Sequence, residues 1–160
     1  MNDRGVPRLV AQFEACTLPR EEWTHPAHLT VALWYASRLP FAEALVTVRE
    51  GILRLNAAHG VSTTPSTGYH ETLTRFYMGL ICDYVAMGEA VGVSWPEQVT
   101  RLLARYGHRD LPLRYYTKEI LISPQARCGW VEPDLRPISA PEAKAIGRRL
   151  AGRRVQPNPR

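Results

Sequence analysis

The sequence predicts an all-α fold: a single-domain bundle of four to five helices with an irregular C-terminal loop region. Apolar residues recur with helical spacing along nearly the whole chain. Residues that favour helix starts and helix ends stand between these periodic stretches. With 160 residues, the chain is long enough to bury one hydrophobic core without disulfides.

The first two helices are predicted over residues 7–16 and from Thr24 to about Arg38. The segment between them, TLPREEW, has the composition of a turn. Thr24 is a favourable N-cap residue, and Pro26 is tolerated in the first helical turn because its missing N–H would have no partner there.

The third and fourth predicted helices are the longest. The third starts after Pro40 and ends before Gly60, since glycine suits the left-handed conformation that follows a helix. Its apolar stripe contains Phe41, Leu45, Val48, Ile52 and Leu55. After the loop VSTTPSTG, the fourth helix is predicted over residues 68–90, with the apolar stripe Leu73, Tyr77, Leu80, Ile81 and Tyr84.

The following part of the chain is less periodic. Ser94 and Glu97 have the spacing of a capping box, which predicts a fifth helix to about Tyr106. The segment GHRDLPL ends this helix, RYYTKEILI fits either a strand or a helix, and SPQARCGWVEPDLRP is predicted to be a loop.

The end of the chain is basic. Ser139 and Glu142 form a second capping box, which predicts a last helix to about Leu150. The final GRRLAGRRVQPNPR carries five arginines and no acid, which accounts for the whole net charge of +5. We therefore expect one domain over residues 1–152 and a basic, flexible tail over residues 153–160, and we do not expect nucleic acid as a partner.

Cysteine usage and hydropathy indicate a cytoplasmic protein. Cys16, Cys82 and Cys128 follow neither a disulfide pattern nor a zinc-binding pattern, which suits a reducing compartment. No stretch approaches the roughly 20 apolar residues of a membrane helix, and the first residues do not have the long apolar run of a signal peptide. We expect the protein to bind a small-molecule ligand and not a membrane. The sequence does not decide whether it forms homo- or hetero-oligomers.

Two histidine groups stand at predicted helix starts. His25 and His28 lie one helical turn apart on an apolar face of the second helix, and His70 begins the apolar stripe of the fourth. Because short connections make neighbouring helices antiparallel, the second and fourth helices should start on the same side of the bundle. The sequence therefore predicts that the three imidazoles converge.

Two kinds of chemistry suit these side chains. Imidazoles and a carboxylate bind divalent transition metals such as Zn, Fe, Cu or Ni, which predicts His25, His28 and His70 as ligands and Glu71 as a further ligand or a base. The alternative needs no metal: Glu71, His70 and His28 would be catalytic residues that transfer protons, for example in an elimination or a cyclisation.

Four more residues are candidates for substrate binding. Arg127 is expected to hold an anionic group. The full set is Arg127, Tyr69, Thr74 and Trp130. His59 precedes a helix-ending glycine, where a cation complements the helix end, and His108 lies in a polar loop, so neither is expected in the site.

The segments WTHPAHLTVALWY, LNAAHGV, GYHETLTRF and, more weakly, ARCGWVEPDL resemble a widespread, functionally uncharacterised family of small bacterial proteins. The family pattern, W-T-H-x-A-H-L followed by G-Y-H-E-T, would carry a site over to His25, His28, His70 and Glu71. The resemblance covers roughly the central third to half of the chain and implies no reaction.

Together these observations predict a small cytosolic enzyme that acts on a small polar metabolite through a His/His/His–Glu site. In one form of this prediction the site binds a divalent metal. Lyase, hydrolase and cyclase chemistry all suit such a site. One alternative is a metal-free acid–base catalyst, as in the tailoring of a secondary metabolite. The other is a non-catalytic helical module that binds a ligand.

Overall fold

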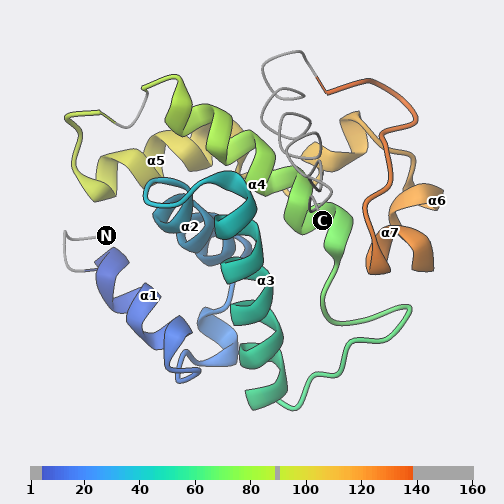
Figure 1. The fold of residues 1–160 in the computed structure, drawn as a ribbon, viewed down its shortest axis with the longest axis horizontal. Coiled ribbons are helices and arrows are strands. Elements are labelled where there is room, and N and C mark those ends of the chain that lie inside the picture. The colour runs from blue at the N-terminus through green and yellow to red at the C-terminus, as the bar shows by residue number, and fades with distance from the viewer. Residues whose placement is uncertain (1–4, 89–90, 139–160) are drawn as a thin grey trace, which may run out of the picture.

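The computed structural model describes residues 5–88 and 91–138, and every regular element in these ranges is helical (Figure 1). The predicted all-α fold is confirmed. The predicted last helix, from residue 139 onward, and the predicted tail lie outside the described residues. Within the described ranges, no helix combines the length and the apolarity that a membrane crossing requires.

Five helices form the bundle: α1 (Gly5–Glu14), α2 (His25–Ala36), α3 (Phe41–Ala58), α4 (Glu71–Ala86) and α5 (Trp95–Tyr106). Shorter elements complete the described chain: η1 (Arg20–Glu22), η2 (Leu111–Arg114), α6 (Lys118–Leu121) and α7 (Pro124–Cys128). Figure 1 shows α6 and α7 next to each other, with α7 beside the first turns of α4. The N-terminal part of α4 is therefore covered by the C-terminal part of the described chain.

The central helix is α2, which packs against α1, α3, α4 and α5. One buried face is expected from its sequence spacing, but contact with four helices buries its other sides as well. Its buried residues are Ala27, Leu29, Thr30, Val31, Ala32, Leu33 and Tyr35. A helix that is apolar all round is a core helix, so α2 fixes the position of whatever side chains stand at its start.

The predicted stripe of α3 is confirmed, because Phe41, Leu45, Val48, Ile52 and Leu55 are all buried. Gly60 follows the helix with a φ of +69°, the left-handed conformation expected there. Gly51 allows a close approach to α1, since a Cβ atom at this position would lie 2.3 Å from Cζ of Phe13. The Phe13 ring therefore packs directly on the α3 backbone.

The starts of α2 and α5 differ in how they are capped. Oγ1 of Thr24 accepts a hydrogen bond from the N–H of Ala27 at 3.4 Å, so the predicted cap of α2 is present. Ser94 occupies the N-cap position of α5, but its side chain makes no capping hydrogen bond. The predicted helix is present, but the predicted capping hydrogen bond of Ser94 is absent. Glu97 forms an ion pair with Arg101, one turn later in the helix.

The start of α4 lies three residues later than predicted. His70 has extended backbone angles, with φ at −137° and ψ at 104°, and serves as the N-cap of a helix that begins at Glu71. Gly68 has a φ of +78°, and a Cβ atom there would lie 2.8 Å from the carbonyl oxygen of Ser62. Residue 68 is therefore a tight loop position that needs glycine.

Two short helices stand where the sequence suggests irregular structure. The helix α7 lies inside a segment predicted to be a loop, so that prediction is wrong, and the ambiguous RYYTKEILI contains α6 and no strand. Thr117 and Ser123 cap these helices by accepting hydrogen bonds from Ile120 and Ala126. Helices of four or five residues are too short to show a periodic apolar pattern.

Candidate functional site

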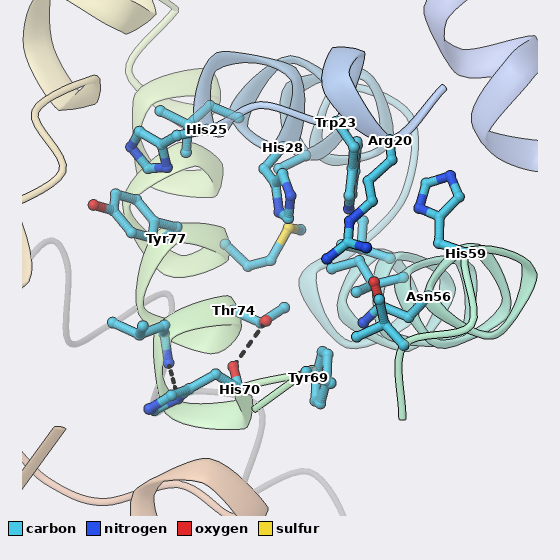
Figure 2. Close-up of a pocket in the computed structure, with 18 residues that line it drawn as sticks. Arg20, Trp23, His25, His28, Asn56, His59, Tyr69, His70, Thr74 and Tyr77 are labelled. Carbon is cyan, nitrogen blue, oxygen red and sulfur yellow. Dashed lines mark hydrogen bonds between the residues drawn. The ribbon is translucent and has the colours of Figure 1, made fainter. Parts of the chain in front are cut away.

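A pocket of about 440 Å³ lies between the start of α2, the middle of α3 and the first half of α4 (Figure 2). We call it the inner pocket. Its aliphatic lining residues are Leu29, Ala32, Val48, Ile52, Val61 and Leu73, and Met78 adds a further apolar side chain. This volume and this mainly apolar lining are typical of a binding site for a small organic molecule.

Five of the predicted site residues line the inner pocket: His25, His28, His70, Tyr69 and Thr74. The two helix starts therefore face the same hollow, as the topological argument expects. Glu71, Arg127 and Trp130 are not among the lining residues.

His28 stacks on Trp23, with ring centroids 3.7 Å apart and planes inclined by 24°. Trp23 also stacks on Phe13 at 5.1 Å. Burial lowers the pKa of His28 to about 4, the charges of His25 and Arg109 add to this effect, and a hydrogen bond to the Trp23 backbone opposes it. The His28 imidazole is therefore neutral at pH 7.

His25 is the first residue of α2, and its ring meets the edge of Tyr77 at a centroid distance of 5.1 Å. Burial lowers the pKa of His25, with a further contribution from Arg109. Among the described residues, neither Nε2 of His25 nor Nε1 of Trp23 has a hydrogen-bond partner, although both atoms are buried. Leaving such an atom unpaired costs about 1–3 kcal/mol, so both atoms favour a bound partner.

His70 is fully engaged with the protein. Its Nδ1 accepts a hydrogen bond from the N–H of Leu73 at 3.3 Å, and its Nε2 lies 2.8 Å from the carbonyl oxygen of Leu121. Because Nδ1 accepts and a carbonyl cannot donate, the ring carries its proton on Nε2. Burial lowers the pKa of His70, and the bond to Leu121 opposes this shift. His70 therefore caps α4 and ties it to α6.

Glu71 does not line the inner pocket. It forms an ion pair with Arg49 of α3, whose Nε donates to Oε2 of Glu71 at 2.9 Å. The Tyr69 hydroxyl donates to the same oxygen at 2.7 Å. Burial and this hydrogen bond raise the pKa of Tyr69 to about 12. Glu71 therefore fixes the Tyr69 ring, which lines the pocket, and holds α4 on α3.

Arg127 and Trp130 support the site from outside. Nη1 of Arg127 donates to the carbonyl oxygens of Gly68 and Tyr69, each at 3.2 Å, so Arg127 braces the loop before α4. Nε1 of Trp130 donates to Glu132 at 2.7 Å. Thr74 lines the pocket, but its hydroxyl already donates to the His70 carbonyl at 2.9 Å.

The structure gives the predicted metal site no complete ligand set. Within residues 5–88 and 91–138, no three His, Cys, Asp or Glu side chains lie close enough together to hold an ion. Both ring nitrogens of His70 have protein partners, and Glu71 is paired with Arg49. Metal binding stays a prediction from the sequence.

Several pocket residues were not predicted from the sequence. Trp23 begins the motif WTHPAHL, and Tyr77 belongs to the apolar stripe of the fourth predicted helix, so the sequence contains a signal for both. His59 was expected to be a helix-end cation, yet it lines the inner pocket, with Nε2 lying 2.8 Å from the Leu18 carbonyl oxygen. Figure 2 shows Arg20 and Trp23 extending toward the pocket from the segment before α2. No sequence signal marked Arg20.

A second, more open pocket adjoins the first, and we call it the outer pocket. It shares five lining residues with the inner pocket: Trp23, His25, His28, Leu73 and Tyr77. Its remaining lining comes from η2, α6 and their flanks: Arg109, Pro112, Leu113, Lys118, Leu121 and Ile122. The two histidines of α2 therefore belong to a wall that both pockets share.

No family model, curated protein or solved structure matches this chain. The likeness of the histidine motifs to a bacterial family stays a prediction, and the geometry of the two pockets is the basis for a function.

Proposed function

We propose that the chain is a small enzyme that binds an organic molecule in the inner pocket and moves a proton on it without a metal ion. The observation that carries the proposal is the pair of buried, unpaired nitrogen atoms in this wall, Nε2 of His25 and Nε1 of Trp23. Both residues line a mainly apolar pocket of suitable volume.

His25 is the proposed base. Its lowered pKa keeps the imidazole unprotonated at pH 7, so a nitrogen lone pair is available to accept a proton. The same shift makes His25 a weaker base than free imidazole. A substrate with an acidic C–H, N–H or O–H group therefore suits this site best, and an elimination or a cyclisation fits such a substrate.

Trp23 is the proposed partner for negative charge that develops during proton removal. An indole N–H can only donate a hydrogen bond, so Nε1 of Trp23 suits an oxygen that gains charge. Apolar walls strengthen such an interaction because little water competes for it. Stacking on Phe13 and His28 holds the indole in place.

Glu71 and His70 are positioning residues in this proposal. Glu71 holds Tyr69 through a hydrogen bond, and His70 fixes the first turn of α4. Both would influence the reaction through the walls of the pocket and not by touching the substrate.

A reducing compartment is part of the proposal. Cys16, Cys82 and Cys128 form no disulfide with one another. Cysteines spread over the chain without disulfides support a cytosolic protein.

The test uses 5-nitrobenzisoxazole, a flat aromatic probe of bases in apolar pockets. The base takes the proton from carbon 3, the C–H electron pair forms the nitrile, and the N–O bond breaks to release a coloured nitrophenolate. We expect the protein to exceed an equal concentration of free imidazole. His25→Ala should lower kcat/KM by about a hundredfold or more, and the rate should fall only at a pH below 6.5, the usual pKa of histidine.

His108→Ala is the matched control, because His108 is exposed and lines neither pocket. It should leave kcat/KM unchanged. If the wild-type rate equals that of His25→Ala, His25 is not the base. If the probe quenches Trp23 fluorescence but the protein does not accelerate its elimination, the protein is a non-catalytic binding module and not an enzyme of this kind.

A further inference from the structure

The charged side chains that line the two pockets all have the same sign. Arg20 lines the inner pocket, and Arg109 and Lys118 line the outer pocket. No aspartate or glutamate lines either pocket. The ion pairs found among the described residues involve other side chains. Three cations therefore line the two pockets, and none of them forms an ion pair with a carboxylate in the described part of the chain.

The positive charge of Arg109 acts on the wall that the pockets share. It lowers the pKa of both His25 and His28, after the larger effect of burial. Asp110 is close enough to contribute to the raised pKa of Tyr77, but it is exposed and lines neither pocket. A negative group bound at this wall would therefore be attracted, and a positive group would be repelled.

The remaining lining suits an uncharged, ring-sized body. Aliphatic side chains of α2, α3 and α4 and the aromatic rings of Trp23, Tyr69 and Tyr77 give the inner pocket its apolar lining, beside the imidazoles of four histidines. Trp23 already stacks on Phe13 and His28, which leaves less of its ring for a cationic ligand.

We propose that the ligand is an organic anion, with an apolar ring-sized body in the inner pocket and a carboxylate or phosphate group in the field of Arg20, Arg109 and Lys118. This inference rests on the proposed function, since it names the charge class of the same site's substrate. Arginine and lysine side chains bind such groups through charge-assisted hydrogen bonds. The unpaired indole N–H of Trp23 would add a neutral donor.

The experiment compares three naphthalene probes of matched shape: 2-naphthoate, naphthalene-2-methanol and 2-naphthylmethylammonium. Binding is followed by NMR through the indole N–H resonance of Trp23, assigned with a Trp23→Phe variant. We expect the anion to bind at least tenfold more tightly than the neutral alcohol, and the ammonium to bind more weakly than the alcohol. One charge-assisted hydrogen bond corresponds to about a tenfold change in Kd.

Variants that remove one positive charge distinguish the electrostatic contribution to binding from the contribution of the pocket's shape. Arg20→Gln and Arg109→Gln should each weaken naphthoate binding by about tenfold and leave the alcohol unchanged. Arg54→Gln is the control, because it removes the same charge from an exposed position of α3 that lines none of the pockets. It should change the Kd of naphthoate by less than twofold.

The proposal is overturned if the alcohol or the ammonium binds as tightly as naphthoate, or if none of the three probes shifts the Trp23 resonance at its solubility limit. It is also overturned if Arg54→Gln has the same effect as Arg20→Gln. These outcomes are independent of the base, because His25→Ala tests proton transfer and the probe series tests only charge. If the protein prefers the anion but does not turn over the benzisoxazole, the proposed anionic ligand is supported and the proposed enzyme activity is contradicted.

Discussion

The pKa of His28 makes a quantitative prediction about acid stability. The imidazole stacks on Trp23 and is partly buried, and this burial lowers its pKa from the usual 6.5 to about 4. In the unfolded chain the ring regains a proton near pH 6.5, while the folded protein resists protonation until about pH 4. The stabilisation is therefore complete above pH 6.5 and is lost as the pH falls toward 4. At about 1.4 kcal/mol for each pH unit, the loss is about 3 kcal/mol.

Urea unfolding at several pH values between about 7 and 4 measures this effect, with the wild type compared with His28→Gln. Glutamine does not titrate and approximates the size of the ring. We expect the free energy of unfolding of the wild type to fall by about 3 kcal/mol more than that of the variant over this range. His108→Gln, at an exposed histidine, should keep the wild-type pH dependence.

One result would refute the reasoning. If the difference in unfolding free energy between the wild type and His28→Gln stays the same at every pH, His28 is not held neutral by burial. Its NMR titration gives an independent check, because the ring resonances should move by no more than about a tenth of their full titration range between pH 7 and pH 5.

Two further predictions concern the helices that position the site. Gly51→Ala should lower the free energy of unfolding by about 1–3 kcal/mol, because the new methyl group overlaps the Phe13 ring. Adding Phe13→Leu to this variant should recover part of the loss. A Gly51→Ala variant as stable as the wild type would show that the Phe13 ring can move aside. Thr24→Ala should cost about 1 kcal/mol in thermal or urea unfolding, since it removes the cap of α2. Ser94→Ala is its matched control, because the Ser94 side chain makes no capping bond, and an equal loss in both variants would contradict the capping argument.

Long, strongly periodic helices were predictable from the sequence. The bounds of α3 and its buried stripe follow from residues three and four apart, and Gly60 marks its end through backbone geometry alone. The start of α4 was not predictable in this way, because the N-cap role of His70 depends on a bond to Leu121, which lies 51 residues further along the chain. The same holds for α6 and α7, whose caps are local but whose length is too short for a periodic signal.

The meeting of the two helix starts was predictable, but the division of roles within the site was not. Antiparallel packing of neighbouring helices places His28 and His70 at one pocket. The partner of Glu71 is Arg49, 22 residues away on α3, and no local pattern pairs them. Arg127 was expected to hold an anionic ligand, and it donates instead to backbone carbonyls of the loop before α4. Long-range hydrogen bonds of this kind decide which side chains stay available to a ligand.

The central position of α2 puts part of the candidate site and much of the core on one piece of the chain. His25 and His28 stand on a helix that four others enclose, so a shift of this helix that retunes the histidines must also disturb the packing of the whole bundle. The three cationic residues are placed differently: Arg20, Arg109 and Lys118 stand on short or irregular segments at the surface. A protein engineer who wants a new ligand should therefore vary those segments and leave the central helix intact.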